Sequence, residues 1–165
     1  MRLNAAWAGD ITACWTSEGW SYLAIVMDLA SRQIVGWALE RTLDTPVVID
    51  ALACALLARA PHRPRLFHSD QGTQYASAAF AQILAAHGIT ASMSRRGNCW
   101  DNAPIESFFS TLKTEAWPTR PWPDVASARA AIASYIDDFY NRRRLHSALN
   151  YQSPMHYAQQ LPTAV

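Results

Sequence analysis

Three strand-like runs open the chain, and the second and third are apolar and rich in Val, Ile and aromatic residues. They span Trp7–Ala13, Tyr22–Leu29 and Gln33–Glu40. Short polar segments at residues 17–19 and 31–32 separate them. This pattern is typical of consecutive β-strands joined by tight turns, so we predict an antiparallel meander.

Helical and strand patterns alternate after the meander. Thr45 predicts a helix N-cap, because Pro46 follows at what would be the first helical position. Apolar residues then recur at the spacing of one helix face, at Val48, Ala51, Leu52 and Ala55. The next predicted elements are a strand, a helix closed by Gly88 and another strand, at Leu66–Ser69, Ser77–His87 and Ile89–Met93. The order βββαβαβα predicts an α/β fold with a mixed five-stranded sheet flanked by helices.

Another helical pattern begins near Asp101, which we interpret as its N-cap, with Pro104 in the first turn. Its apolar face consists of Ile105, Phe108, Phe109 and Leu112. A polar stripe lies beside that face and contains Asn102, Glu106, Ser110 and Lys113, the only lysine of the chain. Glu106 is therefore expected to project toward the ends of the strands and not into the core. Glu115 is expected to be a solvated charge at the end of this helix.

The last long helical pattern is expected to bury one face. That face comprises Ala128, Ala131, Ile132, Tyr135, Ile136 and Phe139. Three consecutive arginines, at 142–144, would then lie at the C-terminal end of the helix, where cations suit the helix dipole.

Three carboxylates come from separate predicted elements. Asp10 lies in the first strand, Asp70 directly follows a short strand, and Glu106 lies on a helix. Carboxylate oxygens are ligands of hard cations such as Mg²⁺. Three of them together could hold two such ions, about 3.5–4 Å apart, for phosphoryl transfer on a nucleic-acid backbone. A carboxylate in a strand is more often simply an exposed or edge residue, so the surrounding sequence has to decide.

Composition narrows the class of protein. The 165 residues can bury a sizeable core, and we expect one domain over residues 1–165. No apolar run approaches the ~18 residues of a membrane span, and no basic-then-apolar leader is seen. The three cysteines lack metal-binding spacing, which favours reduced thiols and a cytoplasmic protein. The net charge is only +1, weak for a protein that binds nucleic acid by itself, so its basic residues would have to cluster.

Several blocks resemble bacterial insertion-sequence transposases with a retroviral-integrase-type core. WAGDIT at 7–12 resembles their first catalytic strand, and residues 19–37 resemble the next two strands. HSDQGTQY at 68–75 resembles the second catalytic block. SMSRRGNCWDNA at 92–103, running on to Glu115, is similar to the third. The closing segment is matched by Tyr140, Asn141, Arg144, His146, Ser153 and Pro154.

The resemblance implies a ribonuclease H-like fold and a bacterial DNA transposase core that cleaves strands and joins a 3′-OH to DNA. Asp10, Asp70 and Glu106 would be the catalytic and metal-binding residues, holding two Mg²⁺ or Mn²⁺ ions. DNA at the element ends and the target would be the partner, together with further copies of the chain. The expected DNA contacts are Arg95, Arg96, Lys113, Arg142, Arg143, Arg144 and His146. Family members normally carry a helical DNA-binding region upstream, so the resemblance implies a core fragment, with an upstream DNA-binding polypeptide as a further expected partner.

Two alternatives remain open at this stage. One is a metal-dependent nuclease of the same fold, and the other is a catalytically idle remnant that only binds DNA. For individual residues, a structural hydrogen bond is at least as good an interpretation of His68 as substrate contact. Arg144 and His146 could equally serve to pack or cap the terminal helix.

Overall fold

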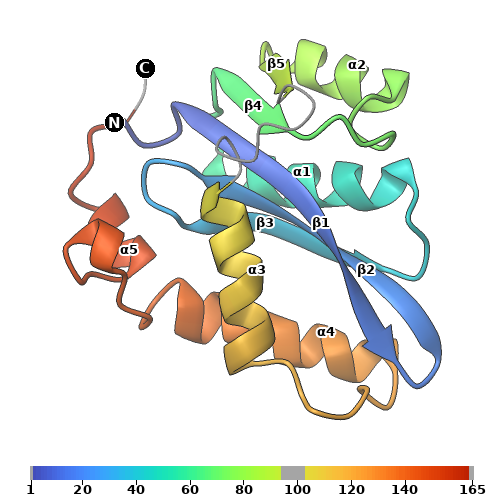
Figure 1. The fold of residues 1–165 in the computed structure, drawn as a ribbon. Coiled ribbons are helices and arrows are strands. Elements are labelled where there is room, and N and C mark those ends of the chain that lie inside the picture. Colours follow the sequence, from blue (N-terminus) through green and yellow to red (C-terminus); the bar gives the residue numbers. More distant parts are fainter. Residues whose placement is uncertain (1, 94–102, 164–165) are drawn as a thin grey trace.

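The computed structural model describes residues 2–93 and 103–163, and its centre is a mixed sheet (Figure 1). Its first three strands, β1 (Ala6–Thr16), β2 (Gly19–Asp28) and β3 (Ile34–Glu40), pair antiparallel. Two short strands, β4 (Leu66–Ser69) and β5 (Thr90–Met93), continue the sheet in parallel from β1. The strand order is β3-β2-β1-β4-β5, which confirms the predicted five-stranded α/β arrangement.

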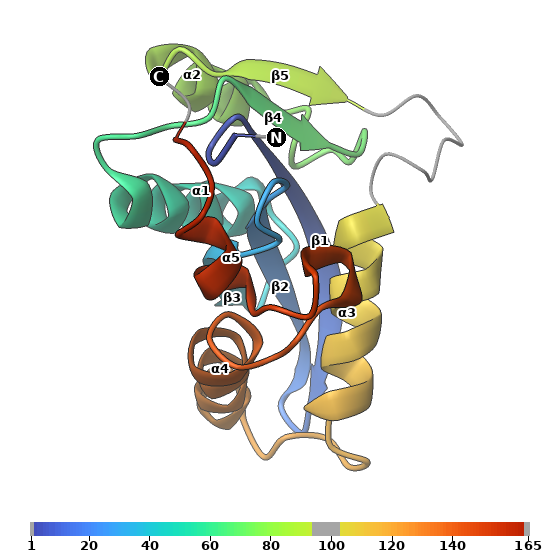
Figure 2. The ribbon, with the colours of Figure 1, turned by 90° about the vertical axis from the view of Figure 1, so that its left-hand side faces the viewer.

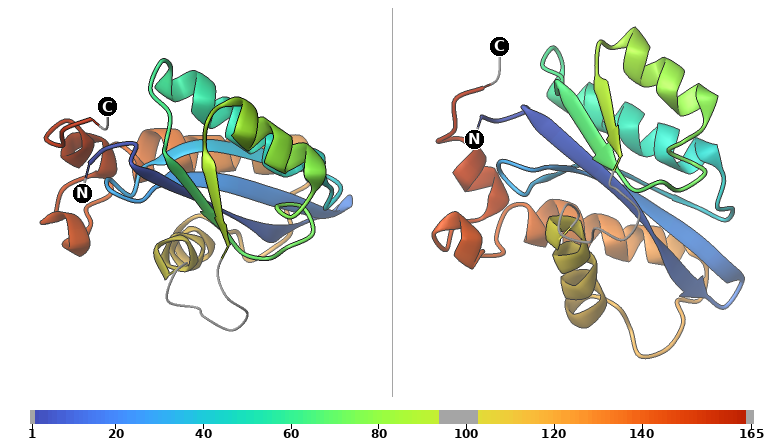
Figure 3. Two further views of the ribbon diagram at one scale, coloured as in Figure 1. Left: turned by 90° about the horizontal axis from the view of Figure 1, so that it is seen from above. Right: turned by 45° about the horizontal axis from the view of Figure 1, so that its top comes forward.

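Helices cover both faces of the sheet (Figure 3). On one side lie α1 (Thr45–Arg59) and α2 (Ala78–Ala86), and on the other lies α3 (Ala103–Glu115). After α4 (Val125–Ala133), a π-helix, η2 (Ser134–Tyr140), continues the same rod. The chain then runs through a 3₁₀ turn, η3 (Ser147–Leu149), to α5 (Pro154–Ala158), and Figure 2 shows this segment crossing toward α3.

The alternation of side chains along the strands creates two hydrophobic cores. In β1, Trp7 packs with α1 and α2, whereas its neighbour Ala8 packs with α3 and α4. The apolar face predicted for α3 is buried as expected. Asp10 has the same parity as Ala8, so strand geometry directs its side chain to the α3 face of the sheet.

Two sequence predictions about the helices are wrong in detail. The N-cap of α1 is Asp44, and Thr45 is already helical. Phe139, expected in the core, is 42% exposed, whereas the next residue, Tyr140, is buried. The π-helix explains this difference, because its wider turn advances the register by one residue; the amide of Asn141, for example, donates to the carbonyl of Ile136.

Across the described residues, no helix combines the length and the hydrophobicity needed to cross a membrane.

Candidate active site

The register between β1 and β4 brings Asp10 and Asp70 to the same edge of the site. Ala8 of β1 is the partner of His68 in the parallel strand β4. Asp10 and Asp70 each lie two residues further along, so the pairing points both carboxylates to the carboxyl end of β4. Each carboxylate also accepts from a nearby backbone amide, Asp10 from Ile11 at 2.8 Å and Asp70 from Gly72 at 2.9 Å. These bonds orient the two side chains.

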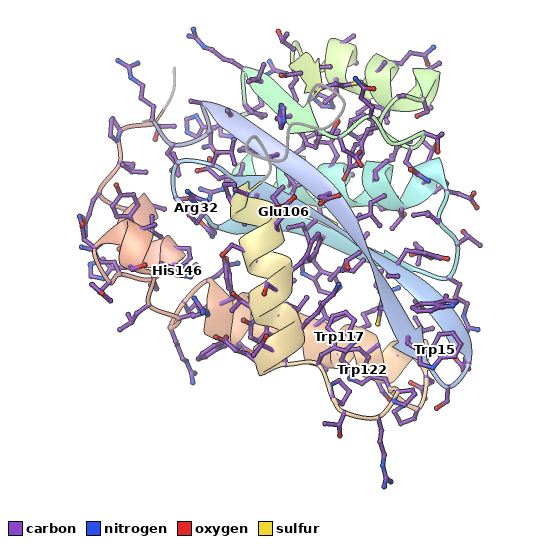
Figure 4. All side chains as sticks on the ribbon, viewed as in Figure 1. Trp15, Arg32, Glu106, Trp117, Trp122 and His146 are labelled. Carbon is purple, nitrogen blue, oxygen red and sulfur yellow. The ribbon has the colours of Figure 1, made fainter. Side chains whose placement is uncertain are left out.

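Glu106 approaches the same place from α3. It lies in the first turn of the helix and is exposed, while its neighbour Ile105 is fully buried in the core. Packing of the apolar face against the sheet therefore fixes the helix rotation that presents Glu106 (Figure 4). The rest of the predicted polar stripe that is described, Ser110 and Lys113, is exposed as well.

Charge interactions link the three carboxylates. The pKa of Asp10 is raised from 3.8 to about 6, chiefly because burial disfavours its charged form. The negative charges of Asp70 and Glu106 raise that pKa further, while the hydrogen bond from Ile11 opposes the rise. The ionisation of Asp10 therefore depends on its burial and on its two acidic neighbours.

A cavity of about 240 Å³ adjoins Asp10 and Asp70, and Tyr75 is part of its wall. Tyr75 is buried, and its pKa is raised well above the usual value by burial and by both aspartates, so it remains a neutral phenol. Gly9 leaves room for this packing, since a Cβ there would lie 2.6 Å from the Phe67 ring and 3.0 Å from the Tyr75 hydroxyl. The motif at 68–75 contained Tyr75, but nothing in the sequence indicated that it supports the two aspartates.

The donor set suits a divalent cation of the Mg²⁺ type, because all three groups are carboxylates and repel one another without a counter-charge. In residues 2–93 and 103–163, no three His, Cys, Asp or Glu side chains are close enough together to hold a metal ion. The three carboxylates interact through their charges without closing around a common point.

The predicted basic residues that the structure describes do not all line one cavity. Arg95 and Arg96, like Asp101, lie outside the described residues. Arg142 and Arg143 are exposed. Arg142 lines one cavity together with Asp137, whereas Arg144 lines a different cavity. His68 makes the structural contact considered for it, with Nδ1 3.1 Å from the hydroxyl of Ser92.

Arg144 and Glu115 form a two-pronged ion pair, so Glu115 is exposed at the end of α3, as expected, and is also held by a partner. The Nε and Nη2 atoms of Arg144 donate to Glu115 at 2.9–3.0 Å, and the Tyr135 hydroxyl donates to the same carboxylate at 2.7 Å. These contacts tie the end of α3 to the segment after η2. They also lower the pKa of Glu115, although burial opposes that change.

Comparison with known proteins defines the class. Two family profiles described as "Integrase core domain" match residues 2–99 and 87–154. The chain belongs to the integrase core domain family.

Its relatives include bacterial transposases. The chain is 42% identical over 151 residues to "Transposase InsF for insertion sequence IS3A" of Escherichia coli (strain K12), covering 92% of this chain and 52% of that protein. It is 40% identical over 151 residues to "Transposase for insertion sequence element IS904" of Lactococcus lactis subsp. lactis (strain IL1403), covering 92% and 60%. The chain thus spans about half the length of the curated relatives it matches.

Solved structures share the fold at low identity. A chain of the simian T-cell lymphotropic virus intasome in complex with PP2A regulatory subunit B56 gamma gives a TM-score of 0.77 at 18% identity, with 98% of this chain and 58% of that chain covered. The HTLV-2 integrase catalytic core domain in complex with magnesium (trimeric form) gives 0.70 at 16% identity, with 96% and 98% covered. The predicted ribonuclease H-like fold is confirmed.

Proposed function

We propose that this chain is the catalytic core of a DNA transposase, which cleaves DNA strands and joins a 3′-OH to target DNA with the help of divalent metal ions. The observation that carries the proposal is the electrostatic coupling of Asp10 with Asp70 and Glu106, three residues brought together from β1, the end of β4 and α3. Membership of the integrase core family and the printed names of the bacterial relatives support DNA as the substrate.

Asp10 and Asp70 would bind both ions from the sheet, and Glu106 would complete the second position from the helix. Two Mg²⁺ or Mn²⁺ ions would, when bound, activate the attacking oxygen and stabilise the leaving oxygen at a scissile phosphate. The backbone amides of Ile11 and Gly72 hold the carboxylates in place. Tyr75, kept neutral by burial, lies with both aspartates in the wall of the cavity.

The proposed DNA contacts outside the carboxylates are Arg95, Arg96, Lys113, Arg142, Arg143, Arg144 and His146. We expect the active assembly to contain several copies of the chain; one of the similar integrase cores is described in trimeric and dimeric forms. A DNA-binding polypeptide upstream and a bacterial cytoplasmic setting remain part of the proposal.

The proposal predicts that Mn²⁺ or Mg²⁺ stabilises the fold through Asp70. An ion that binds only the native state adds about 2.7 kcal/mol to the free energy of unfolding at a hundredfold excess over Kd. We expect Mn²⁺ to raise Tm of the wild-type chain and to leave Tm of Asp70→Asn unchanged. Asp50→Asn is the matched control, because Asp50 is an exposed carboxylate on α1, across the sheet from α3. Equal Mn²⁺ shifts in all three proteins would refute a site at Asp70.

A further inference from the structure

A second cavity, of about 410 Å³, lies between α3 and the segment after η2. Figure 4 shows Arg32 and His146 on this side of α3, toward the end that carries Glu106. Ser107 and Thr111 contribute hydroxyl groups from the helix, and Ser147 contributes another from the opposite wall. None of the described residues that line it is Asp or Glu, whereas Arg32 and Arg144 both face it. The lining therefore favours an anion.

Arg32 brings a positive charge into this cavity from a rigid turn. Its amide donates to the carbonyl of Asp28 at 2.8 Å, and the buried Asp28 carboxylate accepts from the amide and hydroxyl of Ser31 at 2.9 Å each. The φ angle of Arg32 is +61°, a left-handed conformation that a long L side chain rarely adopts. Among the described carboxylates, none forms an ion pair with the Arg32 guanidinium. An uncommon backbone conformation in a well-fixed turn is typical of functional positions.

His146 has an unused hydrogen-bonding atom. Its Nε2 is buried and has no hydrogen-bond partner within the part of the chain that the structure describes. The ring is fixed edge-on against Tyr140, with ring centroids 4.9 Å apart. Burial, followed by the charges of Arg144 and Arg32, lowers the pKa of His146 to about 4. A buried polar atom without a partner calls for an explanation, and a ligand in the cavity that His146 lines, hydrogen-bonded to Nε2, would supply one.

Arg144 has a different role from Arg32. Its guanidinium is already held by Glu115 through two-pronged contact, so much of its charge is compensated. Arg32 is therefore the main source of uncompensated positive charge in the cavity.

We propose that this cavity binds a backbone phosphate of DNA, with the Arg32 guanidinium and His146 Nε2–H as its main donors. The choice of DNA rests on the proposed function, and position supports it: Ser107 in the cavity wall directly follows Glu106 on α3. A strand that places one phosphate at the carboxylates can continue along α3 to this cavity. Leu145 and Tyr151, 62% and 72% exposed at its edge, offer apolar surface to the sugars and bases beside that phosphate.

The decisive variant is Arg32→Asn, measured by fluorescence anisotropy with a short DNA duplex in EDTA. Asn tolerates a left-handed φ, so the turn should fold at least as well as with Arg, and Tm should not fall. We expect DNA affinity to fall about five- to tenfold, and the slope of log K against log salt to shrink by about one, as for loss of one phosphate contact. Arg120→Asn, which removes the same charge from the exposed loop after α3, should change affinity less than twofold and leave the slope unchanged.

NMR of the His146 ring distinguishes the sources of the phosphate. We expect DNA to shift the ring signals at concentrations where inorganic phosphate does not. Saturation by inorganic phosphate with no response to DNA would overturn the assignment, and so would wild-type affinity and salt slope in Arg32→Asn. Because binding is measured without metal, a failure of this site is distinguishable from a failure of the proposed chemistry, which the carboxylate variants test separately.

Discussion

Two influences disfavour the charged form of the Asp10 carboxylate: burial and the proximity of two negative charges. Because its pKa in the folded chain is about 6, compared with 3.8 in the unfolded chain, the folded state holds this proton more tightly. The contribution of Asp10 to the free energy of unfolding is therefore fully present below about pH 4. It is lost as the pH rises through about 6.

The upward direction of this pKa shift leads to a prediction for Asp10→Asn, whose amide carries no charge at any pH. Relative to wild type, the variant should gain stability as the pH rises from about 4 to about 7, by the order of 1–3 kcal/mol. Urea unfolding of both proteins across this range measures the difference, in which other titrating groups such as His146 cancel. A difference that stays constant with pH would show that Asp10 is not perturbed in the fold.

Arg32 is a residue whose left-handed backbone and place in the second cavity no sequence pattern indicated. The polar pair Ser31-Arg32 was correctly interpreted as a turn, but a positive φ is usually signalled by Gly or Asn. Arg32 and His146 line the same cavity because η2 and the following segment fold back onto α3. No local sequence pattern encodes this arrangement.

Among the elements, strand-like sequence runs predicted the first three strands, and a regular helical repeat of apolar residues predicted α3. The helical repeat failed at residues 134–140, where a π-helix replaces the α-helix. The hydrophobic spacing there fits a 3.6-residue repeat well enough to place Phe139 in the core. Instead, the backbone amide of Asn141 donates to the carbonyl of Ile136, and that of Arg144 to the carbonyl of Phe139. Both hydrogen bonds span five residues, and Tyr140 becomes the buried ring.

A pair of alanine variants tests this register. Phe108 is fully buried in α3 and packs edge-on against Tyr140, with ring centroids 4.8 Å apart. Phe108→Ala should cost about 3–5 kcal/mol through the cavity it leaves. Phe139→Ala should cost clearly less, about 1 kcal/mol, because Phe139 is already 42% exposed. Chemical denaturation compares the two, and similar large losses would favour a regular α-helix with Phe139 in the core.

In the whole molecule, the candidate site depends on the order of the strands. Asp10 and Asp70 are sixty positions apart in sequence yet line one cavity because β4 pairs in parallel with β1. Glu106 interacts with Asp10 through its charge because α3 packs on the same face of the sheet. The sequence blocks around them were enough to propose the three carboxylates, and their role as the site stays a prediction. The placement of the arginines in separate cavities could not be predicted from the sequence. Arg142 and Arg144 are near neighbours along the chain but line different cavities.

The most direct test of the central claim is strand transfer by Glu106→Gln. The wild-type chain, with Mn²⁺ and a DNA duplex carrying a free 3′-OH, should yield joined products, whereas a simple nuclease would yield only nicks. Glu106 is exposed beside the buried face of α3, so the amide should leave Tm unchanged or raise it through reduced repulsion. Because an amide binds a hard cation more weakly than a carboxylate, we expect joined products to fall at least a hundredfold. Near-wild-type strand transfer by folded Glu106→Gln would remove this residue from the site and contradict the three-carboxylate account.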